Sequence, residues 1–142
     1  MTNASLLDEA LEAWAEARHG VIAELRNIPP RQIDFRPGAG ARSVAELAVH
    51  IVDTGLMWAA ELSNPKGDFT RKSFPAFMRE YGTRPTRRRR SKVVLVGLLR
   101  TTHATGERQI RRAGELGLLQ QIRRFDDVLG TRLTWMHHGI AH

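Results

Sequence analysis

The sequence predicts an all-α protein, folded as one four-helix bundle domain over residues 1–142. Three observations support this fold class. Four stretches carry apolar residues at the three- and four-residue spacing of an amphipathic helix. Shorter connections that contain proline and glycine separate these stretches. No two stretches read as a credible pair of strands, so the apolar faces are expected to bury one another by helix-on-helix packing.

The first helix is expected to run from about Asn3 or Ser5 to Arg26. Two consecutive prolines end it, because proline has no backbone N–H to donate to a helical hydrogen bond. A loop over residues 32–42 follows, and Phe35 is the residue of this loop that we expect to pack inward. The apolar stripe of the helix consists of Leu6, Leu7, Ala10, Leu11, Trp14, Ala17, Val21, Ile22 and Leu25.

A capping box marks the start of the second helix. The Ser43 hydroxyl can accept a hydrogen bond from the amide three residues on, and Glu46 can reach back to the Ser43 amide. The apolar pattern carries this helix to about Leu62, with Gly55 inside it. That glycine costs about 1 kcal/mol relative to alanine and permits a close approach of another helix. A short extra helix is predicted over residues 74–81, between the second and third long helices.

The third helix is expected from about Ser91 to Arg112. Its valine-rich start could also form a strand, but no second strand is available to pair with it. Residues 116–125 fit either a short helix or an extended segment, and a turn at residues 126–130 follows.

The last helix is expected to begin near Thr131, which leaves about three turns before His142. A helix of this length leaves one corner of the bundle uncovered, because the other helices are about twice as long. Two explanations remain open. Either the sequence stops short of the natural end of the helix, or another chain covers the gap.

Histidines on two of the predicted helices suggest a metal site. His138 and His142 are four residues apart, so they lie on one face of the last helix. If that helix packs against the second one, His50 can join them, and three neutral nitrogens with an open position suit a catalytic divalent metal. Glu46 and Asp53 flank His50 by one turn and could fix its ring tautomer. The alternatives are a hydrogen-bonded core histidine and two solvent-facing carboxylates.

Composition narrows the possible chemistry. The chain has no cysteine, which excludes thiolate zinc sites, disulfide frameworks and cysteine nucleophiles. The same absence fits a cytoplasmic protein. We expect no signal peptide, because the N-terminus lacks a basic region followed by an apolar one. No apolar run approaches the length of a membrane span, so no membrane association is expected.

The net charge of +7 is partly local. Arg84, Arg87–Arg90 and Lys92 form one basic block. Such a block could attract nucleic acid or another anion by counterion release. However, no aromatic residues are interleaved with the arginines, as they are in many single-strand binding surfaces. Nucleic acid is therefore not the expected partner, and a solvated connector is the simpler interpretation.

Three stretches resemble the DinB/YfiT-like superfamily of metal-binding four-helix bundles: residues 28–37, 42–51 and 135–142. The resemblance implies an up-down-down-up bundle that holds zinc, nickel or iron in a pocket at one end, with His50 as the first ligand. In this superfamily the final helix supplies two metal-binding histidines that are four residues apart. These are His138 and His142 here, or His142 is the first of the pair and its partner lies four residues further on.

The resemblance also implies a function. Relatives include thiol-dependent S-transferases and a maleylpyruvate isomerase that use low-molecular-weight thiols, and dimers are common among them. Our hypothesis is therefore a metal-dependent enzyme, thiol S-transferase-like or hydrolase-like, that forms a homodimer. The alternative is a non-enzymatic dimeric helical bundle that acts as an interaction or stress-related binding module.

Overall fold

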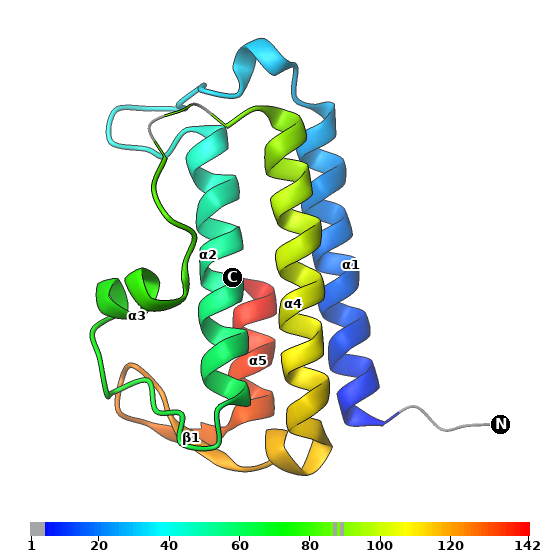
Figure 1. Cartoon of the computed structure of the whole chain (residues 1–142), viewed down its shortest axis with the longest axis vertical. Helices are drawn as coiled ribbons and strands as arrows, with labels where there is room; N and C mark the ends of the chain where they lie inside the picture. Colours follow the sequence, from blue (N-terminus) through cyan, green and yellow to red (C-terminus); the bar gives the residue numbers. More distant parts are fainter. Residues whose placement is uncertain (1–4, 87, 89) are drawn as a thin grey trace, which may run out of the picture.

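The computed structural model describes residues 5–86, 88 and 90–142, and shows three long helices side by side with a shorter fourth (Figure 1). The all-α bundle predicted from the sequence is confirmed. The elements in chain order are α1 (Leu6–Asn27), a 3₁₀ turn (Pro30–Gln32), α2 (Val44–Ser63), α3 (Phe74–Tyr81), α4 (Lys92–Leu118), β1 (Gln121–Arg123), β2 (Leu129–Thr131) and α5 (Arg132–Ala141).

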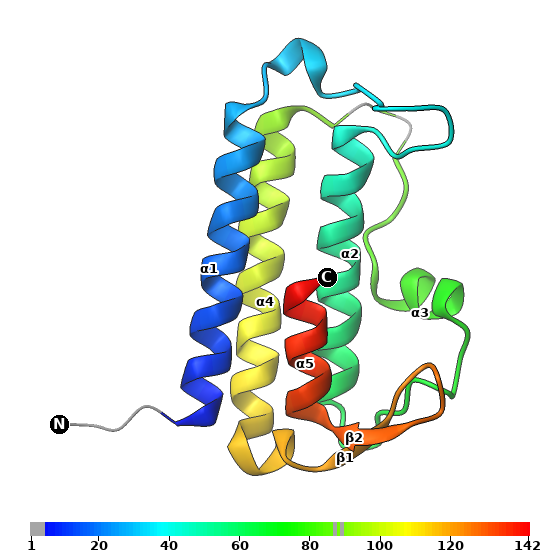
Figure 2. The ribbon, with the colours of Figure 1, turned by 180° about the vertical axis from the view of Figure 1, so that it is seen from behind.

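The long helices leave one corner that α5 fills only in part. α4 packs against both α1 and α2, and α5 packs against both α1 and α2 from the other side. Seen from behind, α5 rises only to about the middle of α2 (Figure 2). An open groove lies between α1 and α2, lined by residues between positions 17 and 28 and between positions 44 and 51, as the short last helix predicts.

Side-chain caps explain where the helices begin. Ser5 and Ser43 each accept a hydrogen bond from the backbone amide three residues on, and Asp8 and Glu46 bond back to complete the two capping boxes. The predicted starts at these serines are confirmed. The alternative start at Asn3 falls outside the described residues.

The loop before α2 contains one error of the sequence analysis. Phe35 is 60% exposed, so the prediction that it packs inward is wrong. Ile33 takes the inward position and is only 2% exposed. The loop is held in this orientation because the Ala45 amide donates to the Ile33 carbonyl and the Val44 amide donates to the Phe35 carbonyl.

A small β-hairpin also corrects the sequence analysis, which found no strand pair. β1 and β2 are antiparallel, with Gln121 opposite Thr131. Asp127 has a φ of 65°, a left-handed conformation that lets the chain turn tightly between the strands. Strands of three residues are too short for an alternating pattern to be visible in the sequence.

The end of α4 differs from the prediction as well. The helix continues beyond Arg112 to Leu118, across an interruption at Gly114, which has a φ of 74°. Glycine adopts this conformation without steric cost, so it allows the interruption. The described residues contain no helix that is long and apolar enough to cross a membrane.

Candidate functional site

Two of the predicted site histidines meet where α5 ends against α2. His50 Nε2 lies 3.4 Å from His142 Nε2, and the ring centroids are 5.6 Å apart. Two nitrogens bound tetrahedrally to one zinc ion, each at about 2.0–2.1 Å, stand about 3.3–3.4 Å apart. The same distance is long for a hydrogen bond. The spacing of the two nitrogens therefore fits a shared metal ion.

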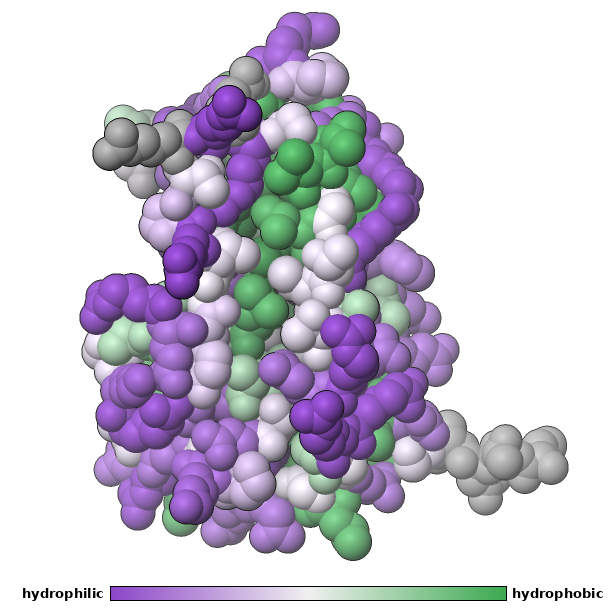
Figure 3. Space-filling model, in the orientation of Figure 1, coloured by the Kyte–Doolittle hydropathy of each residue, from purple (hydrophilic) through white to green (hydrophobic). Residues whose placement is uncertain are grey.

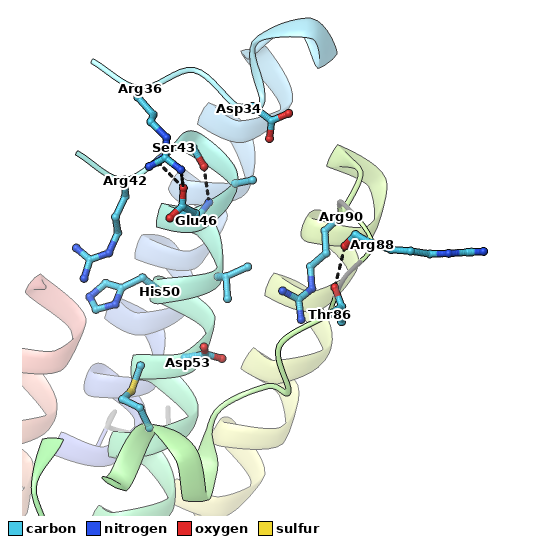
Figure 4. A pocket seen from close by; sticks show the side chains of 13 residues that line it. Asp34, Arg36, Arg42, Ser43, Glu46, His50, Asp53, Thr86, Arg88 and Arg90 are labelled. Carbon is cyan, nitrogen blue, oxygen red and sulfur yellow. Dashed lines mark hydrogen bonds and ion pairs between the residues drawn. The ribbon is translucent and has the colours of Figure 1, made fainter. Parts of the chain in front are cut away.

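His50 lies in an environment that favours its neutral form. Burial lowers its pKa first, the charges of Arg42 and His142 lower it further, and Asp53 opposes them. The imidazole ring extends from α2 toward α5, and the Arg42 side chain reaches down toward it (Figure 4). Only a neutral imidazole has a lone pair free for a metal, so this environment favours ligation at neutral pH.

Close packing of α5 on α2 brings the two histidines together. A Cβ atom at Gly139 would lie only 2.8 Å from Trp58 Nε1, so no larger residue fits between the helices there. Gly139 lies between His138 and His142 on the last helix. The sequence analysis gave this glycine no role. Its value as a contact residue depends on a partner 81 positions away, which local sequence does not reveal.

The third predicted histidine has a different environment. His138 is exposed, and its ring packs against Trp135 with a centroid distance of 5.3 Å. It shares with His142 a pocket of about 360 Å³ that is lined largely by aromatic side chains. Within the described part of the chain, no three His, Cys, Asp or Glu side chains form a group that could hold a metal. The structure thus joins His50 and His142 and leaves His138 apart from them.

The two predicted partner carboxylates bond elsewhere. Glu46 completes the cap of α2 at Ser43 and forms an ion pair with Arg36. Asp53 Oδ1 accepts hydrogen bonds from the backbone amide of Thr83, at 2.8 Å, and from its hydroxyl, at 2.9 Å. Among the residues that the structure describes, neither carboxylate hydrogen-bonds to His50. Both line the same pocket of about 560 Å³ as His50 (Figure 4).

This larger pocket has a basic wall. Arg36, Arg42, Arg88 and Arg90 line it together with the carboxylates of Asp34, Glu46 and Asp53, and Glu46 forms an ion pair with Arg36. Part of the basic block found in the sequence thus lies at this pocket. The other two arginines of the run, at positions 87 and 89, lie outside the described residues. The four arginines exceed the three carboxylates of this lining by one charge, so the pocket is mixed in charge with a small positive excess.

Comparison with known proteins identifies the family of the chain. A sequence model of the DinB superfamily matches residues 13–142, a range that contains both His50 and His142. Searches of curated proteins and of solved structures found no match. The matched range covers most of α1 and every later element of the bundle. The family resemblance predicted from the sequence is confirmed, and the chain belongs to the DinB superfamily.

Proposed function

We propose that the chain is a metal-dependent enzyme of the DinB superfamily in which His50 and His142 bind a divalent metal ion. The observation that carries the proposal is the 3.4 Å separation of their Nε2 atoms. Two imidazole nitrogens without a thiolate suit zinc, nickel or iron. His138, one turn earlier on α5, is the candidate third ligand within this chain. The other candidate is a donor that follows His142.

Two pockets lie beside the histidine pair, one lined by His50 and arginines and the other by His142 and aromatic side chains, and their residues would bind the substrate. A divalent ion held by His50 and His142 would lower the pKa of a water or thiol and so supply a nucleophile near neutral pH. Trp58 and Trp135 on the aromatic side restrict water and can contact an apolar substrate group. Arg42 on the basic side attracts an anionic group. We infer a thiol S-transferase-like or hydrolase-like reaction with a low-molecular-weight thiol or water as the nucleophile.

Metal content tests the proposed site. We expect about one zinc or nickel ion per chain by elemental mass spectrometry, and loss of that ion in His50→Ala and in His142→Ala, because each change removes one of two facing ligands. His19→Ala is the matched control, since this exposed histidine lies on α1 away from the pair. His138→Ala shows whether this residue is the third ligand. Full metal content in His50→Ala would refute the proposal.

A second candidate function, a homodimeric interaction module, has its own support in exposed apolar surface. An open apolar groove of about 410 Å³ lies between α1 and α2, lined by Val21, Leu25 and Leu47 among others. An apolar stripe also runs along the face that shows α2 and α4 (Figure 3). Val93, at the start of α4, is 82% exposed. Exposed apolar patches of this kind can mark sites of protein–protein contact.

Sedimentation of the metal-free chain tests the homodimer. At micromolar concentration we expect a dimer that Leu47→Glu weakens by about tenfold or more, because the new charge would have to lose its water in the interface. Leu116→Glu is the control, since this residue is 79% exposed near the opposite end of α4. A monomer at every concentration, or equal weakening by both substitutions, would remove this candidate.

A further inference from the structure

Arg18 is a buried charge without a counter-ion among the residues that the structure describes. It lies near the middle of α1 and is only 4% exposed. Its Nη1 donates to the Leu99 carbonyl at 2.9 Å and to the Thr102 hydroxyl at 3.4 Å. No described carboxylate forms an ion pair with it. Burial lowers the pKa of Arg18 to about 10, so the guanidinium still carries its charge at neutral pH.

Two other arginines show how this chain normally satisfies a guanidinium. Arg132 is 5% exposed and donates to the carbonyls of Leu62, Asn64 and Pro65 at the end of α2. Arg71 binds both oxygens of Glu61. Both side chains are therefore accounted for by structure alone. Arg18 is different, because its Nη2 donates to no acceptor among the described residues.

The unused end of Arg18 lies at a cavity. A Cβ at Gly55 would lie 2.8 Å from Arg18 Nη2, so the glycine leaves the space that the guanidinium needs. The cavity has a volume of about 200 Å³ and lies between α1, α2 and α5. Arg18, Gly55, Trp14 and Trp58 line it together with His142. It has room for several water molecules or for a small organic anion.

We propose that this cavity binds the carboxylate group of a small-molecule ligand and that Arg18 is the residue that anchors it. A planar guanidinium matches a carboxylate in geometry and charge. The tryptophans beside it lower the local dielectric constant, which strengthens the attraction. The rest of the ligand extends toward His142. Only this direction toward His142 rests on the metal site proposed above. If both sites are correct, the substrate of the metal site carries a carboxylate group.

Binding of acetate, with acetamide as its uncharged analogue, tests the anion site in the metal-free chain. Calorimetry gives the affinity, and tryptophan fluorescence reports occupancy, because Trp14 and Trp58 line the cavity. At constant ionic strength we expect acetate to bind, acetamide not to bind, and Arg18→Met to weaken acetate at least about tenfold. Arg100→Met, an exposed arginine on α4, is the matched control and keeps the wild-type affinity.

A second variant keeps Arg18 in place. Gly55→Ala puts a methyl group against Nη2 and is expected to weaken acetate as well, while circular dichroism shows whether the helices remain. Absence of acetate binding in the wild-type chain, or equal binding in Arg18→Met, would overturn the inference. The metal site and the anion site can be refuted independently of each other. Loss of metal without loss of acetate in His50→Ala supports both, whereas metal binding without acetate binding refutes only the anion site.

Discussion

Replacing Arg71 with alanine is expected to lower the free energy of unfolding by about 2–4 kcal/mol. The reason is that it leaves Glu61, a fully buried carboxylate, without its cation. Arg71 Nε and Nη2 each donate to a Glu61 oxygen at 2.7 Å. The expected loss lies toward the low end for a broken buried pair, because the Arg71 side chain is itself 31% exposed and water can replace part of it.

Glu61 joins three separate segments, which is why its partner matters. It also accepts hydrogen bonds from the Asp68 amide at 2.8 Å and from the Tyr81 hydroxyl at 3.1 Å. These contacts hold the loop after α2 and the end of α3 against α2. Chemical unfolding at neutral pH measures the effect, with Arg79→Ala on the exposed side of α3 as the control, expected within about 0.5 kcal/mol of wild type. A change below about 1 kcal/mol in Arg71→Ala would contradict the argument.

The same carboxylate predicts how stability depends on pH. Burial raises the pKa of Glu61, but the hydrogen bonds from Arg71, Asp68 and Tyr81 outweigh it, so the net shift is downward. A lowered pKa in the folded state means that the stabilisation is present above the unfolded value of about 4.3 and is lost as the pH falls through the folded value. Arg71→Ala should therefore flatten this acid-side loss of stability.

Local sequence signals predicted most of the fold. The serine caps and proline stops depend on neighbours within four residues, so they can be read from the chain directly. The hairpin could not be predicted, since its strands have three residues each. Phe35 was misplaced because hydrophobicity alone does not say which of two apolar residues in a loop faces inward. Backbone hydrogen bonds to α2 decide that in favour of Ile33.

The site was predictable only in part, for the same reason. Helical spacing placed His138 and His142 on one face, and His50 was expected to join them if the two helices packed together. The structure places the nitrogens of His50 and His142 at 3.4 Å and leaves His138 apart. The hydrogen bonds of Asp53 were not predictable, because its partner Thr83 is 30 positions away. Arg18 gave no signal, since in the sequence it is one more charged residue on a charged helix. Its importance comes from burial by segments far along the chain.

The second prediction with a large effect on stability concerns Gly106 on α4. Gly106→Ala is expected to lower the free energy of unfolding by about 1–3 kcal/mol, the usual cost of overfilling a core. A Cβ at this position would overlap with Trp14 Cη2 and lie 3.1 Å from the Ala59 Cβ. The indole cannot move away easily, because its ring centroid lies 4.4 Å from those of Trp58 and His103.

Two opposing effects make this substitution informative. Alanine in a helix interior is favoured over glycine by about 1 kcal/mol, so without the contact to Trp14 the change would stabilise the protein. Gly97→Ala on the same helix isolates that gain, since a Cβ there meets nothing within 4 Å. We expect the two alanine variants to shift thermal and urea unfolding in opposite directions. If both stabilise, α1 and α4 are further apart than described. In that case Trp14 keeps its position, and acetate binding in the Arg18 cavity, which Trp14 lines, should be unchanged in Gly106→Ala.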